Sequence, residues 1–225
     1  ILKNRIKGTP YAQMLPEFPG MTIEDLKNRA KVLAGRADNK WVDGLQIGAL
    51  DIEASNLKSN VGIMLSWAIQ PQHGDPVYDV ITRKEAINWD KGDKRITQSL
   101  ADELENYDML VTWYGTNFDI PAIRTRLSWW ELKNPLKFGD RYHYDLYYTC
   151  RSKFNLHSNR LEAAAQFFGI EMKHKKLTPY HWQQARLGDS EMLDYIVKHN
   201  LEDVDVTMQL YHKLKEFKKL TRKSV

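Results

Sequence analysis

Two carboxylates, Asp51 and Glu53, lie in an otherwise apolar run of the sequence, the segment GALDIEAS at 48–55. Such a run is typical of a buried strand, and residues i and i+2 of a strand point to the same face. A D-x-E pair in a strand is often an edge strand with its polar face in water, and that alternative stays open. The apolar flanks favour a central strand, where two unpaired anions are costly. A bound hard divalent cation, which prefers carboxylate oxygen, would remove that cost.

A third acid, Asp119, stands at the start of a helix-like segment that follows a strand and a glycine turn, in LVTWYGTNFDIPAI at 110–123. Asp is a common helix N-cap, which is the simpler explanation for this residue. A carboxylate at that position can also point at a site beside the end of the strand. Asp119 is therefore a candidate metal ligand in addition to Asp51 and Glu53.

A fourth acid and a histidine lie in the helical pattern YIVKHNLEDVDVTMQLYHKL at 195–214. His199 and Asp203 are one helical turn apart and share a face that borders the apolar seam. The simpler alternative is an exposed i,i+4 pair. Glu202 and Asp205 point further out, and we expect them to be ordinary surface charge.

The elements that must position these side chains begin at Leu45. Strand-like runs are expected at 45–55, 60–71, 76–82 and 108–115, and helices at 96–107, 119–132, 158–170, 178–188 and from 189 or 190 to about 218. The segment YHYDLYYTC at 142–150 is compatible with a fifth strand or a short helix. Three antiparallel strands followed by alternating strands and helices predict an α/β fold, a mixed sheet with helices on both faces.

Residues 1–44 are expected to form an N-terminal arm that contains a helix from about Thr22 to Ala34, with Thr22 as N-cap and Asp25 three residues on. Residues 45–218 would form the folded domain, and 219–225 a basic C-terminal tail. Residues 213–225 carry six Lys/Arg and one Glu, a charge of +5. The net charge of the whole chain is +4, so residues 1–212 sum to −1. A basic segment suits a polyanionic partner, although a solvated helix end is an equally simple explanation.

The cysteine content and the hydropathy of the sequence indicate the cellular compartment. A single cysteine, Cys150, excludes an internal disulfide and a thiolate zinc cluster, and it favours a reducing, intracellular compartment, the cytoplasm. No apolar run approaches the roughly 18 residues of a membrane span. We therefore expect no membrane partner.

The order of these motifs is more specific than any one of them. A D-x-E strand (LDIEAS), then NFDIP at the start of a helix (YGTNFDIPAI), then HNLEDVDVT on a late helix resembles the DEDD superfamily of 3′→5′ exonucleases, which have a ribonuclease-H-like fold. HYDLYYTCRS and NRLEAAAQFFGI are similar to segments of family B polymerase proofreading domains and related stand-alone nucleases. The resemblance covers roughly residues 45–215.

The resemblance implies that Asp51, Glu53, Asp119 and Asp203 bind two divalent ions, Mg²⁺ or Mn²⁺. His199 would orient or deprotonate the attacking water. The resemblance is imperfect at two positions. His199 has the spacing to the last Asp at which one subgroup has Tyr, while another subgroup has His one residue earlier. Many members also have Asn where this chain has Tyr114. Asp145 matches an acid common in relatives, and we interpret it as structural or as a support to the site.

The function that the resemblance implies is metal-dependent 3′→5′ hydrolysis of single-stranded nucleic acid, which we expect to be DNA, to nucleoside 5′-monophosphates. An RNA-trimming or structure-specific endonuclease on the same fold, and a nucleic-acid-binding module without turnover, are the alternatives. Partners would be the nucleic acid strand and a polymerase or other replication protein. Candidate substrate contacts, each of which has a simpler packing or solvent-exposed explanation, are the aromatic pair at Ser128–Trp130 and Lys173, Lys175 and Lys176.

Overall fold

The structure is a computed structural model of the 225-residue chain, and it describes residues 13, 16, 20, 22–27, 42–88, 92–174, 176–218 and 220–225. The chain divides into two compact units, Ile1–Asp43 and Gly44–Val225. In the first unit, Thr22 and Asp25 cap the helical residues 23–27: the Thr22 N–H donates to Asp25, and the Asp25 N–H donates to Thr22 Oγ1. The predicted helix therefore starts where expected, and its residues beyond Lys27 lie outside the described part of the chain.

A five-stranded sheet forms the centre of the second unit, with the strand order β3-β2-β1-β4-β5. The strands are β1 (Ile47–Ala54), β2 (Met64–Pro71), β3 (Val77–Val80), β4 (Met109–Thr112) and β5 (Tyr142–Asp145). The first three pair antiparallel, and β4 and β5 run parallel to β1. The predicted fold class, a mixed α/β sheet, is confirmed.

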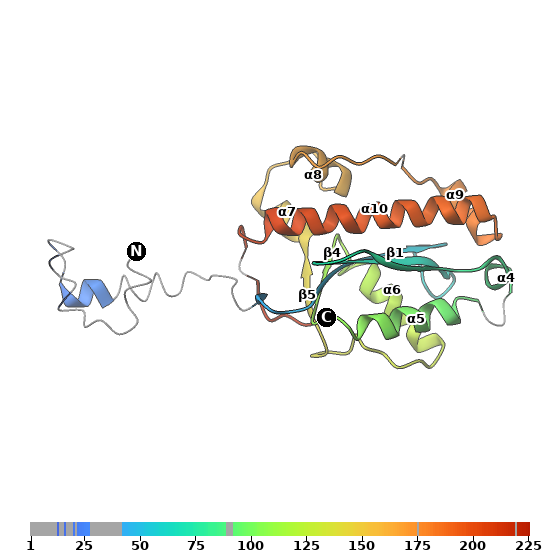
Figure 1. The fold of residues 1–225 in the computed structure, drawn as a ribbon, viewed down its shortest axis with the longest axis horizontal. Coiled ribbons are helices and arrows are strands. Elements are labelled where there is room, and N and C mark those ends of the chain that lie inside the picture. The colour runs from blue at the N-terminus through green and yellow to red at the C-terminus, as the bar shows by residue number, and fades with distance from the viewer. Residues whose placement is uncertain are drawn as a thin grey trace. The chain divides into compact units, whose positions relative to one another are not determined.

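Helices cover both faces of this sheet (Figure 1). One face carries α7 (Leu146–Lys153), α8 (Leu161–Phe167), α9 (Pro179–Arg186) and the long α10 (Ser190–Leu214). The other face carries α5 (Lys94–Leu104) and α6 (Asp119–Trp129), and the short α4 (Arg83–Ala86) follows β3. Because helices lie on both faces, the middle strands are apolar almost throughout, and every residue of β4 is buried. No helix among the described residues is both long enough and apolar enough to cross a membrane.

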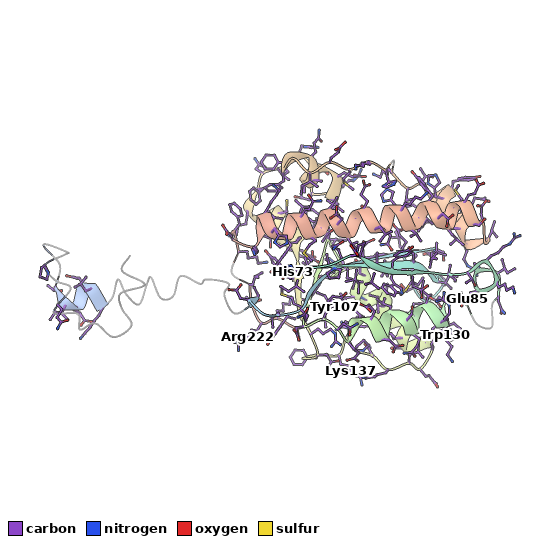
Figure 2. All side chains as sticks on the ribbon, in the orientation of Figure 1. His73, Glu85, Tyr107, Trp130, Lys137 and Arg222 are labelled. Carbon is purple, nitrogen blue, oxygen red and sulfur yellow. The ribbon has the colours of Figure 1, made fainter. Side chains whose placement is uncertain are left out.

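A buried polar cluster fixes α6 against the hairpin that joins β1 to β2. Asp93, fully buried at the start of α5, accepts hydrogen bonds from Arg126 of α6 at 2.6 and 2.8 Å and from the Met64 N–H of β2 at 2.8 Å. Trp130, on the same side of the sheet as α5 (Figure 2), donates to Asp93 Oδ1 at 2.8 Å. Arg126 also donates to the Ser59 carbonyl in the hairpin turn. The helix that carries Asp119 is therefore held at both the sheet and the turn.

The structure gives more detail than the sequence for two segments. The segment 142–150 contains both of the alternatives, the last parallel strand and then α7, with Asp145 capping the Tyr147 N–H. The described residues of the basic C-terminal segment pair with β5. The His143 N–H donates to the Lys223 carbonyl at 2.9 Å, and the Val225 N–H donates to the Arg141 carbonyl at 3.1 Å. Residues 220–225 thus lie along the outer edge of β5.

Candidate active site

The central strand of the sheet carries the first two candidate acids. Asp51 and Glu53 alternate with buried apolar residues on β1, which has β2 on one side and β4 on the other, so the edge-strand alternative does not hold. Each carboxylate has one side-chain donor from the α9–α10 layer. Asn200 Nδ2 donates to Asp51 Oδ2 at 2.6 Å, and Trp182 Nε1 donates to Glu53 Oε2 at 2.7 Å.

Asp119 faces β1 instead of capping its own helix. The N-cap of α6 is Phe118, and Asp119 is the first helical residue and is only 3% exposed. Its Oδ1 accepts a hydrogen bond from the Ile52 N–H at 3.1 Å. The parallel pairing of β4 with β1 covers Ile47–Ala49, so Ile52 lies beyond it, and Asp119 takes the place of the next ladder partner. The carboxylate is thereby directed at the stretch between Asp51 and Glu53.

A glycine turn and a buried acid set the approach to Asp119. A Cβ on Gly115 would collide with the Thr112 side chain at the end of β4, so the turn requires glycine. Asp145 accepts hydrogen bonds from the Tyr114 N–H and the Thr116 N–H, both at 2.9 Å. These bonds hold Tyr114 at φ 69°, a left-handed conformation that is uncommon for a bulky residue. These two hydrogen bonds agree with the structural role expected for Asp145.

His199 is buried beside these carboxylates and the Asp203 side chain is only 20% exposed, so the exposed-pair alternative does not hold. His199 is 7% exposed, and its Nδ1 lies 3.6 Å from Asp203 Oδ2, longer than a hydrogen bond. Within the described part of the chain, neither ring nitrogen of His199 has a hydrogen-bond partner, and nor does Asp203 Oδ1. Ligand atoms of Glu53, His199 and Asp203 all lie within 4.8 Å of one another.

Burial and mutual repulsion raise the pKa of all four acids. Burial, followed by the charges of Asp119, Asp203 and Glu53, raises the pKa of Asp51 well above its ordinary value. Burial raises the pKa of Glu53 to about 8 against the opposing hydrogen bond from Trp182. Burial likewise raises the pKa of Asp119 to about 7 and is the main cause of the raised pKa of Asp203.

The pKa of His199 is also raised. Burial alone would lower it, but Asp203 and the charge of Glu53 outweigh that effect. Four acids with raised pKa values lie beside three polar atoms of His199 and Asp203 that have no partner among the described residues, and such a set fits a divalent cation well.

A cavity of about 440 Å³ opens beside His199 and Asp203. Aromatic side chains from the β4–α6 turn and from α7 line it, Trp113, Tyr114 and Tyr147 among them. Tyr114 and Tyr147 meet edge to face, with ring centroids 4.6 Å apart. The wall offers flat apolar surface next to the carboxylates.

Several neighbours of the site were not expected from the sequence. Trp182 lies outside the motifs, and Asn200 lies within HNLEDVDVT but had no role assigned to it. Glu202 was expected at the surface, but its side chain is only 10% exposed, and it accepts hydrogen bonds from the Lys173 N–H at 2.5 Å and the His174 N–H at 3.0 Å. That expectation was wrong because the loop before α9 folds over α10.

Of the predicted substrate contacts, some lie at the cavity and others do not. Lys176 lines the cavity, whereas Lys175 lies outside the described residues. Trp129 is 66% exposed and its neighbour Trp130 binds Asp93, so this pair belongs to the α5–α6 side of the sheet, opposite α10.

Comparison with known proteins agrees with this fold. The structure superposes on that of the family B DNA polymerase from the hyperthermophilic archaeon Pyrobaculum calidifontis with a TM-score of 0.61 and 18% sequence identity. The match covers 76% of this chain and 24% of the polymerase, so the chain spans about a quarter of that protein. The expected similarity to family B polymerases is confirmed as a similarity of fold. No curated protein matches the chain in sequence. Residues 49–215 match the sequence model of the RNase H superfamily, and the chain belongs to that superfamily.

Proposed function

We propose that the protein is a metal-dependent 3′→5′ exonuclease that releases nucleoside 5′-monophosphates from single-stranded DNA. The observation that carries the proposal is the convergence of Asp51, Glu53, Asp119 and Asp203, four acids with raised pKa values, on one end of the central strand. Membership of the RNase H superfamily, whose members include nucleases, supports the reaction class. Residues 45–218 would be the catalytic domain, with 1–44 as an N-terminal extension and 219–225 as a short basic tail.

The carboxylates have the chemistry to hold Mg²⁺ or Mn²⁺, and we assign them as the ligands of two ions. Two such ions supply charge stabilisation at the attacked phosphate and at the leaving oxygen of a phosphodiester. Trp182 and Asn200 orient Glu53 and Asp51 through the 2.7 and 2.6 Å hydrogen bonds. His199, which the sequence resemblance assigns to the attacking water, lies among the same carboxylates, so it is placed to act either on that water or on a bound ion.

The aromatic cavity supports a single-stranded substrate. Bases stack on aromatic rings irrespective of sequence, each contact contributing about 1–3 kcal/mol, and a base can stack only where it is not paired. Tyr114 and Tyr147 offer such rings within the same cavity as His199 and Asp203. A polymerase or another replication protein is the natural partner for this activity, since the fold resembles part of a DNA polymerase.

Digestion of matched strands tests the proposal. DNA and RNA strands labelled at the 3′ or the 5′ end are incubated with Mg²⁺ or Mn²⁺ and then with a chelator. We expect mononucleotides from the 3′-labelled DNA at once, a ladder from the 5′-labelled DNA, and no cleavage with the chelator. Internal fragments would indicate an endonuclease, faster loss of RNA an RNA-trimming enzyme, and binding without products a non-catalytic module.

Paired variants tie the activity to the site. Asp51→Asn and Asp203→Asn keep the shape of each side chain but remove its charge, so cleavage should stop while the fold persists. Asp205→Asn is the matched control, because Asp205 is exposed on the same helix and its side chain contacts Gln209. Near wild-type cleavage by either site variant would overturn the assignment.

A further inference from the structure

Three polar atoms in the site are buried without a hydrogen-bond partner among the residues that the structure describes. They are the two ring nitrogens of His199 and Oδ1 of Asp203. A buried polar atom that has lost its water and gained no partner costs free energy, so native proteins rarely leave one, and three in one place indicate a ligand. A carboxylate oxygen and the unprotonated nitrogen of a neutral imidazole are both electron-pair donors, so a cation fits as the partner of Asp203 Oδ1 and of one His199 nitrogen, while the other nitrogen carries the proton.

The donors come from two elements and meet at one point. Glu53 extends from β1, and His199 and Asp203 extend from α10, with one ligand atom of each lying within 4.8 Å of the others. Ligand atoms about 2.0–2.2 Å from one ion can be no more than about 4.4 Å apart. The three side chains therefore need to close by only a few tenths of an ångström to share an ion. The i,i+4 spacing of His199 and Asp203 suits this, because it places two donors on one helix face.

The surrounding residues hold these donors in place. Trp182 fixes Glu53 from α9, and Asn200, next to His199 on α10, binds both Asp51 and the Ser66 hydroxyl of β2. The His199 ring lies near the rings of Tyr195 and His174, with centroids 6.5 and 6.4 Å away. The imidazole thus occupies a defined position facing the carboxylates.

We propose that His199 is itself a metal ligand and that Glu53, His199 and Asp203 form a mixed carboxylate–imidazole site, which binds Mn²⁺ or Zn²⁺ more tightly than Mg²⁺. Hard Mg²⁺ prefers oxygen ligands and keeps its waters, whereas imidazole nitrogen suits first-row transition ions. The inference deepens the proposed function and rests on it only for the catalytic meaning of the site. If carboxylates alone held the ion, substitution of His199 would not change the preference for Mn²⁺ or Zn²⁺ over Mg²⁺.

Imidazole nitrogen NMR on the intact protein tests the ligation directly. Histidine ¹⁵N spectra are recorded for the metal-free protein and after one equivalent of Zn²⁺, and separately with excess Mg²⁺. We expect one ring nitrogen to shift with Zn²⁺ and not with Mg²⁺, and that resonance to be missing from His199→Tyr and His199→Asn. His212→Asn is the control, since His212 is exposed at the far end of the same helix.

Calorimetric titration gives the affinities. The wild type should bind Mn²⁺ or Zn²⁺ at least about tenfold more tightly than Mg²⁺, and His199→Tyr should lose at least about tenfold of the transition-metal affinity while Mg²⁺ affinity changes less. Both His199→Tyr and His199→Asn are measured in case one of them fails to fold. The shift in the wild-type spectrum is a test that does not depend on either variant. An unshifted His199 resonance at saturating Zn²⁺, or equal Mg²⁺ and Zn²⁺ affinities, would overturn the inference.

The two proposals fail separately. Zn²⁺ ligation by His199 without strand cleavage would refute the exonuclease and leave the metal site standing. Metal-dependent cleavage with a His199 resonance that ignores the metal would refute the ligand role alone.

Discussion

Replacing Glu53 by Gln should stabilise the metal-free protein, and by an amount that grows with pH. The folded-state pKa of Glu53 is about 8 against an ordinary value of 4.5, chiefly because the carboxyl is buried. The folded protein therefore keeps a proton that the unfolded chain loses above pH 4.5, and its stability falls as the pH rises from about 4.5 to about 8. One pKa unit corresponds to about 1.4 kcal/mol, so the wild type forgoes about 3 kcal/mol at about pH 7. Gln has no proton to lose, and its side-chain oxygen can still accept from Trp182.

Calorimetric unfolding in excess chelator measures the effect. At about pH 7 the Glu53→Gln variant should melt about 6–12 °C above the wild type, and at about pH 4.5 the two should coincide. Added Mn²⁺ should reverse the order, because the ion stabilises a folded state that retains the carboxylate. Glu216→Gln, at an exposed position after α10, should change neither curve. A difference that does not depend on pH, or a variant less stable at about pH 7, would refute the buried-acid reasoning.

Three further predictions test the contacts around the site. Trp182→Phe removes the donor to Glu53 and should weaken metal binding about 10–100-fold by calorimetry; unchanged affinity would show that the contact is incidental. Tyr114→Gly relieves the left-handed backbone but removes a stacking ring, so thermal stability should hold while single-stranded DNA binding, measured by fluorescence anisotropy, falls by about 1–3 kcal/mol. Arg126→Met leaves Asp93 buried without its cation and should lower the free energy of unfolding in urea by about 3–5 kcal/mol. A decrease below about 1 kcal/mol would contradict the conclusion that the Asp93–Arg126 pair holds α6 in place.

The sequence assigns the candidate acids to their strands and helices because each lies within a local pattern. Asp51 and Glu53 interrupt an apolar strand, and His199 and Asp203 follow a helical period, so their faces follow from backbone geometry. Asp119 illustrates the limit of local reasoning. Its position near a helix start fits both a cap and a site residue, and only the end of the β1–β4 ladder decides between them.

The supporting residues were not predictable for a related reason. Trp182 reaches Glu53 across 129 positions of sequence, so the contact depends on how α9 packs over β1. Glu202 has the helical position of a surface residue, and it is covered by a loop whose path no periodicity encodes. At 142–150 the local signals for strand and helix were both present because the segment contains both.

The pairing of residues 220–225 with β5 has a consequence for how the protein behaves at high concentration. An unpaired edge strand is a template for another chain and promotes aggregation through intermolecular sheet growth. On β5 that edge is occupied by the chain's own Lys223 and Val225 backbone. On the opposite edge, β3 is only four residues long and carries Asp79, which pairs with Arg95. The edge at β5 is thus covered and the edge at β3 is short and charged, so the basic C-terminal segment protects β5 against self-association in addition to any role in binding a polyanion.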